Sequence, residues 1–406
     1  MQLNPRLAVC LQVGVVCCCA LVQAEPRALP AVSAESVGMD AEKLRQIDDA
    51  VAAALKEERM PGCVVTVGRR GCIVFQKAYG NRQVEPEREA MTVDTVFDLA
   101  SLTKPIATAT SVMLLAEREQ IDLDEPAAKY LPEFTGRGKQ RITVRHLLLH
   151  TSGLTADNAL GDYTDGPEKA WERICGLKLL SAPGERFRYS DVGFIVLGKL
   201  VERVSKKPLN EFADENIFAP LGMKETGFLP PKNLRLRAAP TQRREDRWMR
   251  GEVHDPRAWE LGGVAGHAGL FSTADDLARY AQMMAEQGRL DETQILSRKM
   301  HSLMTSGKNV SGGLRGFGWD VQTGYSSNRG QGWSAGAFGH GGFTGTAMWI
   351  DPELEMFVIF LSNRVHPAGK GSVNRLAGEI GTIAADAIVA DANEQRPPRK
   401  VQGDSR

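Results

Sequence analysis

The sequence predicts a mixed α/β (α+β) fold in which both chain ends form one antiparallel sheet with flanking helices, and the middle of the chain is inserted as a largely helical region. Near the N-terminus a helical pattern is followed by a hairpin pattern, and near the C-terminus a strand pair is followed by a helical pattern. The simplest way to bury the apolar faces of these elements is one shared sheet with helices packed against it.

The first residues have the features of an export signal: Arg6, an apolar run over residues 7–22, and a small-x-small cleavage pattern before Glu25. We therefore expect residues 1–24 to be a cleavable signal peptide and the mature protein to be periplasmic or extracellular. The apolar run is short for a membrane span and no later segment has the required length, so we expect no membrane span.

Fifty basic and fifty acidic residues give a formal net charge of +0, which argues against a nucleic-acid partner.

The first folded elements are expected to be a helix and a hairpin. Residues 40–57 place Leu44, Ile47 and Val51 at helical spacing, which is typical of an amphipathic helix. Residues 63–67 and 72–79 are apolar and β-branched and flank a Gly-Arg-Arg-Gly turn, which indicates two paired strands.

Ser101 and Lys104 form a Ser-x-x-Lys motif where a helix is expected to start. Serine is a common N-terminal capping residue, and apolar residues continue at helical spacing over residues 106–119. The two side chains should therefore share one helix face. A neighbouring amine can activate a serine hydroxyl if the amine is kept neutral, although a capped helix with a surface lysine would show the same pattern.

Three histidines in the middle of the chain could be read as sites. His146 and His150 have the i, i+4 spacing of a zinc pair, but the glutamate of a His-Glu-x-x-His site is absent, so we expect core packing and no metal. His267 lies in a glycine-dense stretch that lacks the Lys-Ser/Thr of a phosphate loop. We expect a structural histidine there rather than a catalytic one, and no cofactor.

Two further stretches could contribute to a site. Tyr189 stands just before an apolar helix that starts near residue 192; it could relay a proton, or be a buried tyrosine with a paired hydroxyl. Residues 305–338 are mostly glycine and polar apart from a strand-like stretch at 316–321, which indicates an irregular binding rim. The glycines beside His340 would let the backbone approach a ligand closely, or would form a bulged strand end.

The last elements complete the predicted domain. Residues 344–350 and 356–362 form a strand pair, and apolar residues at helical spacing follow over 373–384. We expect one domain over residues 25–392. Its α/β part should cover about 37–95 and 310–391, its helical part about 96–309, and residues 393–406 should be a polar, disordered tail.

Ser101-x-x-Lys104, Tyr189-Ser190-Asp191 and His340-Gly341-Gly342 occur in the order and at the rough separations of the penicillin-recognising serine hydrolases. The chain resembles the branch that holds class C β-lactamases, low-molecular-mass penicillin-binding proteins and serine esterases. It is most similar to a penicillin-binding subgroup named after D-alanyl-D-alanine carboxypeptidases. The resemblance covers about residues 37–390 and implies a β-lactamase/transpeptidase-like fold.

This resemblance also implies roles for individual residues. Ser101 would be the acylated nucleophile, Lys104 the amine that helps to deprotonate it, and Tyr189 the group that passes the proton to the leaving group. The backbone N–H groups of Ser101 and Phe343 would form the oxyanion hole. The predicted substrate-binding residues are Asp191, His340, Gly341 and Gly342.

Three positions depart from the family pattern. Asp191 stands where asparagine is frequent, and a carboxylate there would keep Lys104 charged and shift the role of base toward Tyr189. His340 replaces a lysine and Gly341 replaces a threonine. In the family pattern, that lysine and that threonine would contact a substrate carboxylate.

We therefore expect a secreted active-site serine hydrolase that acts through an acyl-enzyme on D-alanyl peptides or β-lactams. Because His340 and Gly341 weaken carboxylate recognition, a carboxylesterase for small esters is the alternative. A penicillin-binding module that senses without turnover is a third possibility. The substrate would be a small molecule or a peptidoglycan-type peptide, and the sequence indicates no particular oligomeric state.

Overall fold

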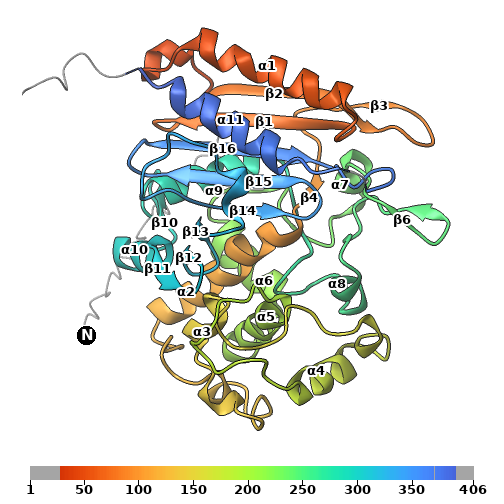
Figure 1. Cartoon of the computed structure of the whole chain (residues 1–406), viewed down its shortest axis with the longest axis vertical. Coiled ribbons are helices and arrows are strands. Elements are labelled where there is room, and N and C mark those ends of the chain that lie inside the picture. The colour runs from red at the N-terminus through yellow and green to blue at the C-terminus, as the bar shows by residue number, and fades with distance from the viewer. Residues whose placement is uncertain (1–27, 370, 390–406) are drawn as a thin grey trace, which may run out of the picture.

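The computed structural model describes residues 28–369 and 371–389 (Figure 1), so the predicted signal peptide and the predicted disordered tail lie outside the described residues. A nine-stranded sheet has the order β11-β12-β13-β14-β15-β16-β1-β2-β3. Its strands are β11 (Lys308–Val310), β12 (Gly313–Arg315), β13 (Asp320–Gln322), β14 (Phe338–Gly342), β15 (Thr346–Asp351), β16 (Met356–Ser362), β1 (Gly62–Arg69), β2 (Cys72–Gln83) and β3 (Glu89–Ala90).

The two chain ends meet at the centre of this sheet. β1 and β16 are antiparallel neighbours, with Val65 opposite Phe360. The predicted hairpin β1–β2 and the predicted strand pair β15–β16 flank this junction. The fold class is therefore confirmed: strands from both termini form one antiparallel sheet.

Two helices cover one face of the sheet, as predicted. α1 (Ala41–Lys56) and α11 (Asn374–Asp386) lie side by side above it (Figure 1). The Asp40 side chain accepts hydrogen bonds from the first backbone N–H groups of α1, which fixes where this helix begins. Ile47 of α1 and Ile380 of α11 pack with Val65 in one buried cluster.

The opposite face packs against the helical part of the chain. α9 (Ala274–Ala285) lies beneath the sheet, and the side chain of Thr273 caps its N-terminus by accepting from the backbone N–H of Asp276. Val64 and Ile359 point to this side and share a buried cluster with Met283 of α9. Because neighbouring strand residues point to opposite faces, both faces of β1 are buried.

The middle of the chain is mostly helical. Its other helices are α2 (Thr110–Glu117), α3 (Val144–Leu148), α4 (Pro167–Gly176), α5 (Asp191–Ser205), α6 (Leu209–Ala213), α7 (Lys232–Arg237), α8 (Pro256–Glu260) and α10 (Arg298–Thr305). Short strand pairs lie between them: β4 (Phe97–Asp98), β8 (Leu270–Ser272) and β5 (Gly227–Phe228) form one small sheet, and β6 (Arg243–Arg244) with β7 (Arg247–Trp248) and β9 (Arg289–Leu290) with β10 (Thr293–Gln294) form two others.

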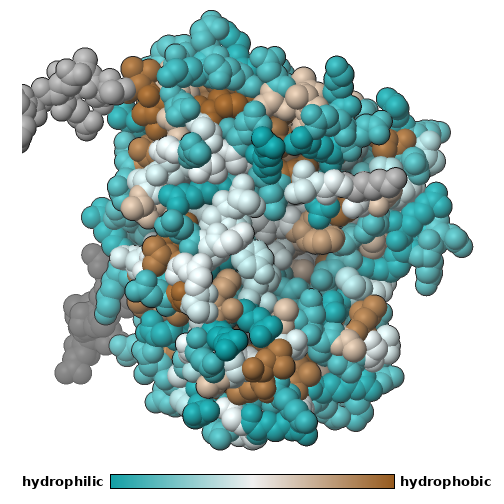
Figure 2. Space-filling model, viewed as in Figure 1, coloured by the Kyte–Doolittle hydropathy of each residue, from teal (hydrophilic) through white to brown (hydrophobic). Residues whose placement is uncertain are grey.

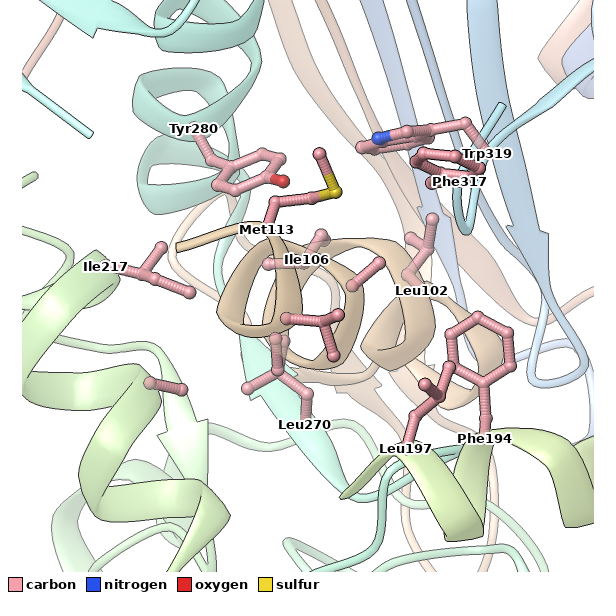
Figure 3. Close-up of a cluster of buried hydrophobic side chains, with 14 of the residues drawn as sticks. Leu102, Ile106, Met113, Phe194, Leu197, Ile217, Leu270, Tyr280, Phe317 and Trp319 are labelled. Carbon is pink, nitrogen blue, oxygen red and sulfur yellow. The ribbon is translucent and has the colours of Figure 1, made fainter. Parts of the chain in front are cut away.

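The helical segment after Ser101 runs through the centre of this core. In Figure 3 its side chains Leu102, Ile106 and Met113 are surrounded by residues from several other elements, among them Phe194 of α5 and Tyr280 of α9. The segment is anchored on all sides, so the positions of Ser101 and Lys104 are fixed by packing.

The helix expected to start at Ser101 has a different form. A 3₁₀ turn at Ala100–Leu102 leads into a π-helix at Lys104–Ala109, and only then does α2 begin. Ser101 makes no capping hydrogen bond. The expectation that Ser101 caps the helix is therefore wrong.

The expected irregular rim at residues 305–338 is also partly wrong. Three short strands, β11 to β13, extend the sheet beyond β14. They pair over only a few residues each, and glycines interrupt them, so their sequence resembles a loop.

On the face in Figure 2, polar residues predominate and hydrophobic residues form small separate groups. Among the described residues no helix combines the length and the apolar character that crossing a bilayer requires.

Candidate active site

The turn that carries Ser101 is held by a buried carboxylate. Asp98, at the end of β4, accepts hydrogen bonds from the backbone N–H of Ala100 at 2.8 Å and of His254 at 2.6 Å. Ala100 adopts a φ of 46°, a left-handed conformation that is strained for a residue with a side chain. Because Asp98 stabilises this conformation, the next residue, Ser101, is presented half-buried at the start of the helical segment.

Lys104 lies fully buried beneath Ser101. Its Nζ donates to Ser101 Oγ at 2.9 Å and to the backbone oxygen of His267 at 2.9 Å, and lies 2.6 Å from Asp191 Oδ1. The first of these contacts confirms that Ser101 and Lys104 share one face. Two of the N–H donors of the ammonium are thus hydrogen-bonded, and the Asp191 carboxylate balances its charge.

The charge state of Lys104 follows from these neighbours. Burial by itself would lower the pKa of Lys104, but the Asp191 carboxylate, and next the Tyr189 hydroxyl, raise this pKa above its ordinary value. Lys104 is therefore an ammonium near neutral pH. In that state it cannot accept the serine proton, but it stabilises negative charge that develops near it.

Tyr189 completes the group around Ser101. Lys104 Nζ lies 5.0 Å from the centroid of the Tyr189 ring. The ring is stacked between two other rings, His150 at 4.5 Å and Tyr325 at 5.0 Å between centroids. This stack fixes the plane of the ring, so that its hydroxyl stays near Ser101 and Lys104.

His340, in β14, faces the hydroxyl of Tyr189. Burial lowers the pKa of His340 well below its ordinary value, and the charges of Arg315 and Lys104 lower it further, so the imidazole is neutral. Its Nδ1 lies 2.7 Å from the backbone oxygen of Gly341, which can only accept, so Nδ1 carries the proton. Nε2 is then an acceptor, and it lies 3.5 Å from Tyr189 Oη.

Two threonines that follow β14 bind the segment just before Ser101. Thr344 Oγ1 donates to the backbone oxygen of Asp98 at 2.7 Å, and Thr346 Oγ1 donates to that of Leu99 at 3.1 Å. Gly342 and Phe343 are therefore held beside Ser101. The Phe343 side chain is 61% exposed and stacks on His254, so this residue can serve the site through its backbone N–H.

Gly341 points the other way. Alternate strand residues face opposite sides, and a Cβ atom added at Gly341 would lie 2.4 Å from Asn328 Nδ2. The threonine of the family pattern would not fit here without moving Asn328. Of the four predicted substrate-binding residues, the structure thus brings the side chains of Asp191 and His340 to the site, and Gly342 by its backbone.

Replacing Gly342 with alanine is expected to impair both stability and turnover. The added Cβ would lie 2.2 Å from Thr346 Oγ1 and 2.4 Å from the backbone oxygen of Leu99. Overpacking of this kind costs about 1–3 kcal/mol, and displacing an oxyanion donor lowers kcat about 10- to 100-fold. Thermal unfolding and ester hydrolysis would measure the two effects.

Gly161→Ala is the matched control, since nothing lies within 4 Å of the Cβ position at Gly161. A Gly342→Ala protein as stable and as active as the Gly161→Ala protein would contradict the close approach described for β14.

The other histidines have structural roles. His146 and His150 do not form a pair: the side chain of His146 accepts from the backbone N–H of Thr143 in a capping box, whereas His150 is buried under Tyr189 and its Nδ1 accepts from the backbone N–H of Ser190. The backbone of His267 supports Lys104, and its Nε2 lies 2.9 Å from Asp255 Oδ1.

Asp191, Asp255 and His267 together offer ligand atoms within 4.8 Å of one another, which is the spacing of a cation site. Lys104 already lies at this cluster, 2.6 Å from Asp191 Oδ1. Asp255 also contributes to Lys104: although burial opposes it, the neighbouring His267 and Lys104 hold the pKa of Asp255 below its ordinary value. We assign the cluster to holding the ammonium.

Some residues of the site were not predicted from the sequence. Asp98 precedes the Ser-x-x-Lys motif directly, and its adjacency to the turn was a usable signal. Asp255 lies in a stretch, Val253-His254-Asp255, that resembles the family, but Tyr325 and Arg315 carry no local signal, because each reaches the site from a separate segment.

The comparisons with known proteins agree with this arrangement. A family model named Beta-lactamase matches residues 47–381. The chain belongs to the beta-lactamase family. A relative from Salmonella agona (strain SL483), named "Putative D-alanyl-D-alanine carboxypeptidase", is 31% identical over 386 residues, which cover 85% of this chain and 88% of the relative.

Several solved structures have the same fold as this chain. EstCE1, described as a hydrolase with promiscuous acyltransferase activity, superposes with a TM-score of 0.69 at 24% identity and covers 85% of this chain and 99% of its own. A class C beta-lactamase superposes with a TM-score of 0.70 at 16% identity and covers 86% and 97%. These findings confirm the family resemblance and support a hydrolase.

Within this beta-lactamase-family site, Asp191→Asn is expected to move the acid limb of the pH–rate profile to lower pH. The pKa of Tyr189 lies above its ordinary value: burial raises it most, Lys104 lowers it, and the Asp191 carboxylate raises it again. Removing that negative charge makes the phenolate easier to form, so the limb should fall by about one pH unit. The measurement is kcat/KM for an ester across the stable pH range.

Asp94→Asn is the control for a general charge effect, because the side chain of Asp94 is 58% exposed at the surface. An acid limb that stays in place or rises in Asp191→Asn would show that Asp191 is not coupled to the group that titrates.

Proposed function

We propose that this protein is a secreted active-site serine hydrolase that forms an acyl-enzyme on Ser101. The observation that carries the proposal is the 2.9 Å hydrogen bond between Lys104 Nζ and Ser101 Oγ, with the ammonium held by Asp191 and with Tyr189 beside it. Such a set of nucleophile, cation and phenol has the geometry of covalent acyl transfer.

Acylation would proceed with Tyr189 as the base. In the reactive ionisation state Lys104 is an ammonium and Tyr189 a phenolate. As Ser101 Oγ forms a bond to the substrate carbonyl carbon, its proton passes to Tyr189 Oη and the carbonyl oxygen becomes an oxyanion. The backbone N–H groups of Ser101 and Phe343 would stabilise that oxyanion.

Tyr189 would then act as the acid. Its new proton goes to the leaving amine or alcohol as the bond to the carbonyl carbon breaks, which leaves the acyl group on Ser101. In the second half-reaction Tyr189 takes a proton from water, the resulting hydroxide attacks the acyl carbon, and Ser101 Oγ leaves with the proton.

For the substrate we propose D-alanyl peptides or the related β-lactams, because the 31%-identical relative carries a carboxypeptidase name. A specific observation favours small esters as the second candidate. His340 is neutral, and no side chain extends from position 341, so the position of the family's lysine offers no fixed charge to a substrate carboxylate.

A trapping experiment tests the mechanism. The exported, full-length protein is treated with a fluorescent penicillin and, separately, with a fluorophosphonate, digested, and the modified peptide is sequenced by mass spectrometry. We expect the adduct on Ser101. An adduct on another serine, or no adduct with either reagent, would overturn the proposal.

A substrate panel then separates the alternatives. Rates are compared for a p-nitrophenyl ester, nitrocefin and a D-alanyl-D-alanine peptide. Release of D-alanine supports the carboxypeptidase, whereas turnover of the ester alone supports the esterase. Stable acylation without product release would favour a binding module instead.

A further inference from the structure

Arg315, at the end of β12, is an unusual buried cation. The side chain is 0% exposed. Within residues 28–369 and 371–389 its three side-chain nitrogens have no hydrogen-bond partner, and its closest charge contact there is an ion pair of 3.3 Å from Nη1 to Asp320 Oδ1. Burying an arginine with unsatisfied donors is costly, so the presence of a buried arginine at this position calls for an explanation.

The guanidinium lies against the aromatic group behind the active site. Its Cζ is 5.5 Å from the ring centroid of Phe187 and 6.0 Å from that of Tyr189. Burial lowers the pKa of His150 well below its ordinary value, and Arg315 lowers this pKa further, as it does for His340. Arg315 therefore adds to the effect of burial, which is the main reason that both imidazoles beside Tyr189 are uncharged.

Asp320 connects this arginine to the outer wall of the site. Its carboxylate accepts from Thr323 Oγ1 at 2.8 Å and from Ser326 Oγ at 2.7 Å. The backbone N–H of Tyr325 donates in turn to Thr323 Oγ1 at 3.1 Å. The charge pair thus supports the loop whose tyrosine stacks on Tyr189.

The charged and titratable groups around the Tyr189 hydroxyl come from several elements. Among the described residues they are Lys104 of the π-helix, Asp191 of α5, His150 after α3, Arg315 of β12, Asp320 of β13, Tyr325 of the following loop and His340 of β14. With both histidines neutral, Lys104 and Arg315 are the two fixed cations of this group. Lys104 is neutralised by Asp191 in direct contact, whereas the ion pair of Arg315 is longer.

We propose that Arg315 is a positioning residue that stabilises the negatively charged form of the Tyr189 hydroxyl. This inference rests on the proposed function, in which that phenolate takes the Ser101 proton. Position 340 has lost its permanent positive charge, and Arg315 supplies one from behind the same tyrosine. The guanidinium Cζ lies 6.0 Å from the centroid of the Tyr189 ring, onto which a phenolate delocalises part of its charge, and charges interact strongly in a buried, low-dielectric site.

The charge of Arg315 can be separated from its shape by three variants. Arg315→Gln removes the charge, and the acid limb of kcat/KM for an ester should rise by about one pH unit. Arg315→Lys keeps the charge and should leave the limb close to that of the wild type. Asp320→Asn removes the neutralising carboxylate, so the limb should move to lower pH.

The opposite signs for Arg315→Gln and Asp320→Asn exclude a merely structural role, which would lower the rate of both proteins without moving the limb. Arg118→Gln is the matched control: this arginine lies over the ring of Phe212, 5.7 Å from its centroid, and should leave the limb unmoved. Thermal unfolding identifies variants that fail to fold. If Arg315→Gln does not fold, Asp320→Asn carries the test.

An unmoved limb in Arg315→Gln and Asp320→Asn, in proteins that still turn over the ester, would overturn the role of Arg315 and leave the serine mechanism intact. An adduct that does not map to Ser101 would instead remove the proposed function itself. The two failures are therefore distinguishable.

Discussion

Ser101→Ala is expected to lower kcat/KM for a p-nitrophenyl ester about 10⁴-fold or more. Without Oγ no acyl-enzyme can form, and only the polarising effect of the remaining groups is left. Labelling by a fluorophosphonate should disappear in the same protein. Intact-protein mass spectrometry and steady-state kinetics measure the two effects.

Ser111→Ala is the matched control for this change. Ser111 lies ten residues after Ser101 in the same helical segment and is fully buried. Its Oγ donates to the backbone oxygen of Ala107 at 2.6 Å. Its loss should cost about 1 kcal/mol of stability and leave labelling intact. Equal labelling of the Ser101→Ala and wild-type proteins would show that the nucleophile lies elsewhere.

Tyr189→Phe is expected to lower kcat about 10²- to 10⁴-fold, which is the range for loss of a general acid–base group. The phenyl ring can keep both stacking contacts, at 4.5 Å to His150 and 5.0 Å to Tyr325, so thermal unfolding should change little. The acid limb of the pH–rate profile should also disappear, because the group that titrates has been removed. Full pH–rate profiles of both proteins give the comparison.

Tyr325→Phe provides the control for this second prediction. Tyr325 is 54% exposed and belongs to the same stack, so the substitution removes a phenol beside Tyr189 without touching Lys104 or Ser101. We expect nearly wild-type rates. If Tyr189→Phe were also fully active, Lys104 would have to be the base, and the ammonium state described for it would be wrong.

The elements at the two chain ends could be predicted because their signals are local. α1 and the β1–β2 hairpin each show the period of their own secondary structure, and the same holds for β16 and α11. The short strands β11 and β12 could not, since their pairing within the sheet, rather than their composition, makes them strands, whereas β13 overlaps the strand-like stretch at 316–321. The π-helix after Ser101 was missed for a similar reason: the surrounding core determines how that segment winds.

The sequence by itself determined the family and the local pairing of Ser101 with Lys104, because three residues of helical chain suffice to place both side chains on one face. The family resemblance, with an aspartate at position 191, already predicted a charged Lys104, and the tertiary structure decided the charge state of His340 and what holds the ammonium in place. The ammonium of Lys104 and the neutral imidazole of His340 depend on burial and on Asp191 and Arg315, which reach the site from separate segments. Charge interactions act through space, so their effect on a site can be read only once the folded chain has brought its parts together.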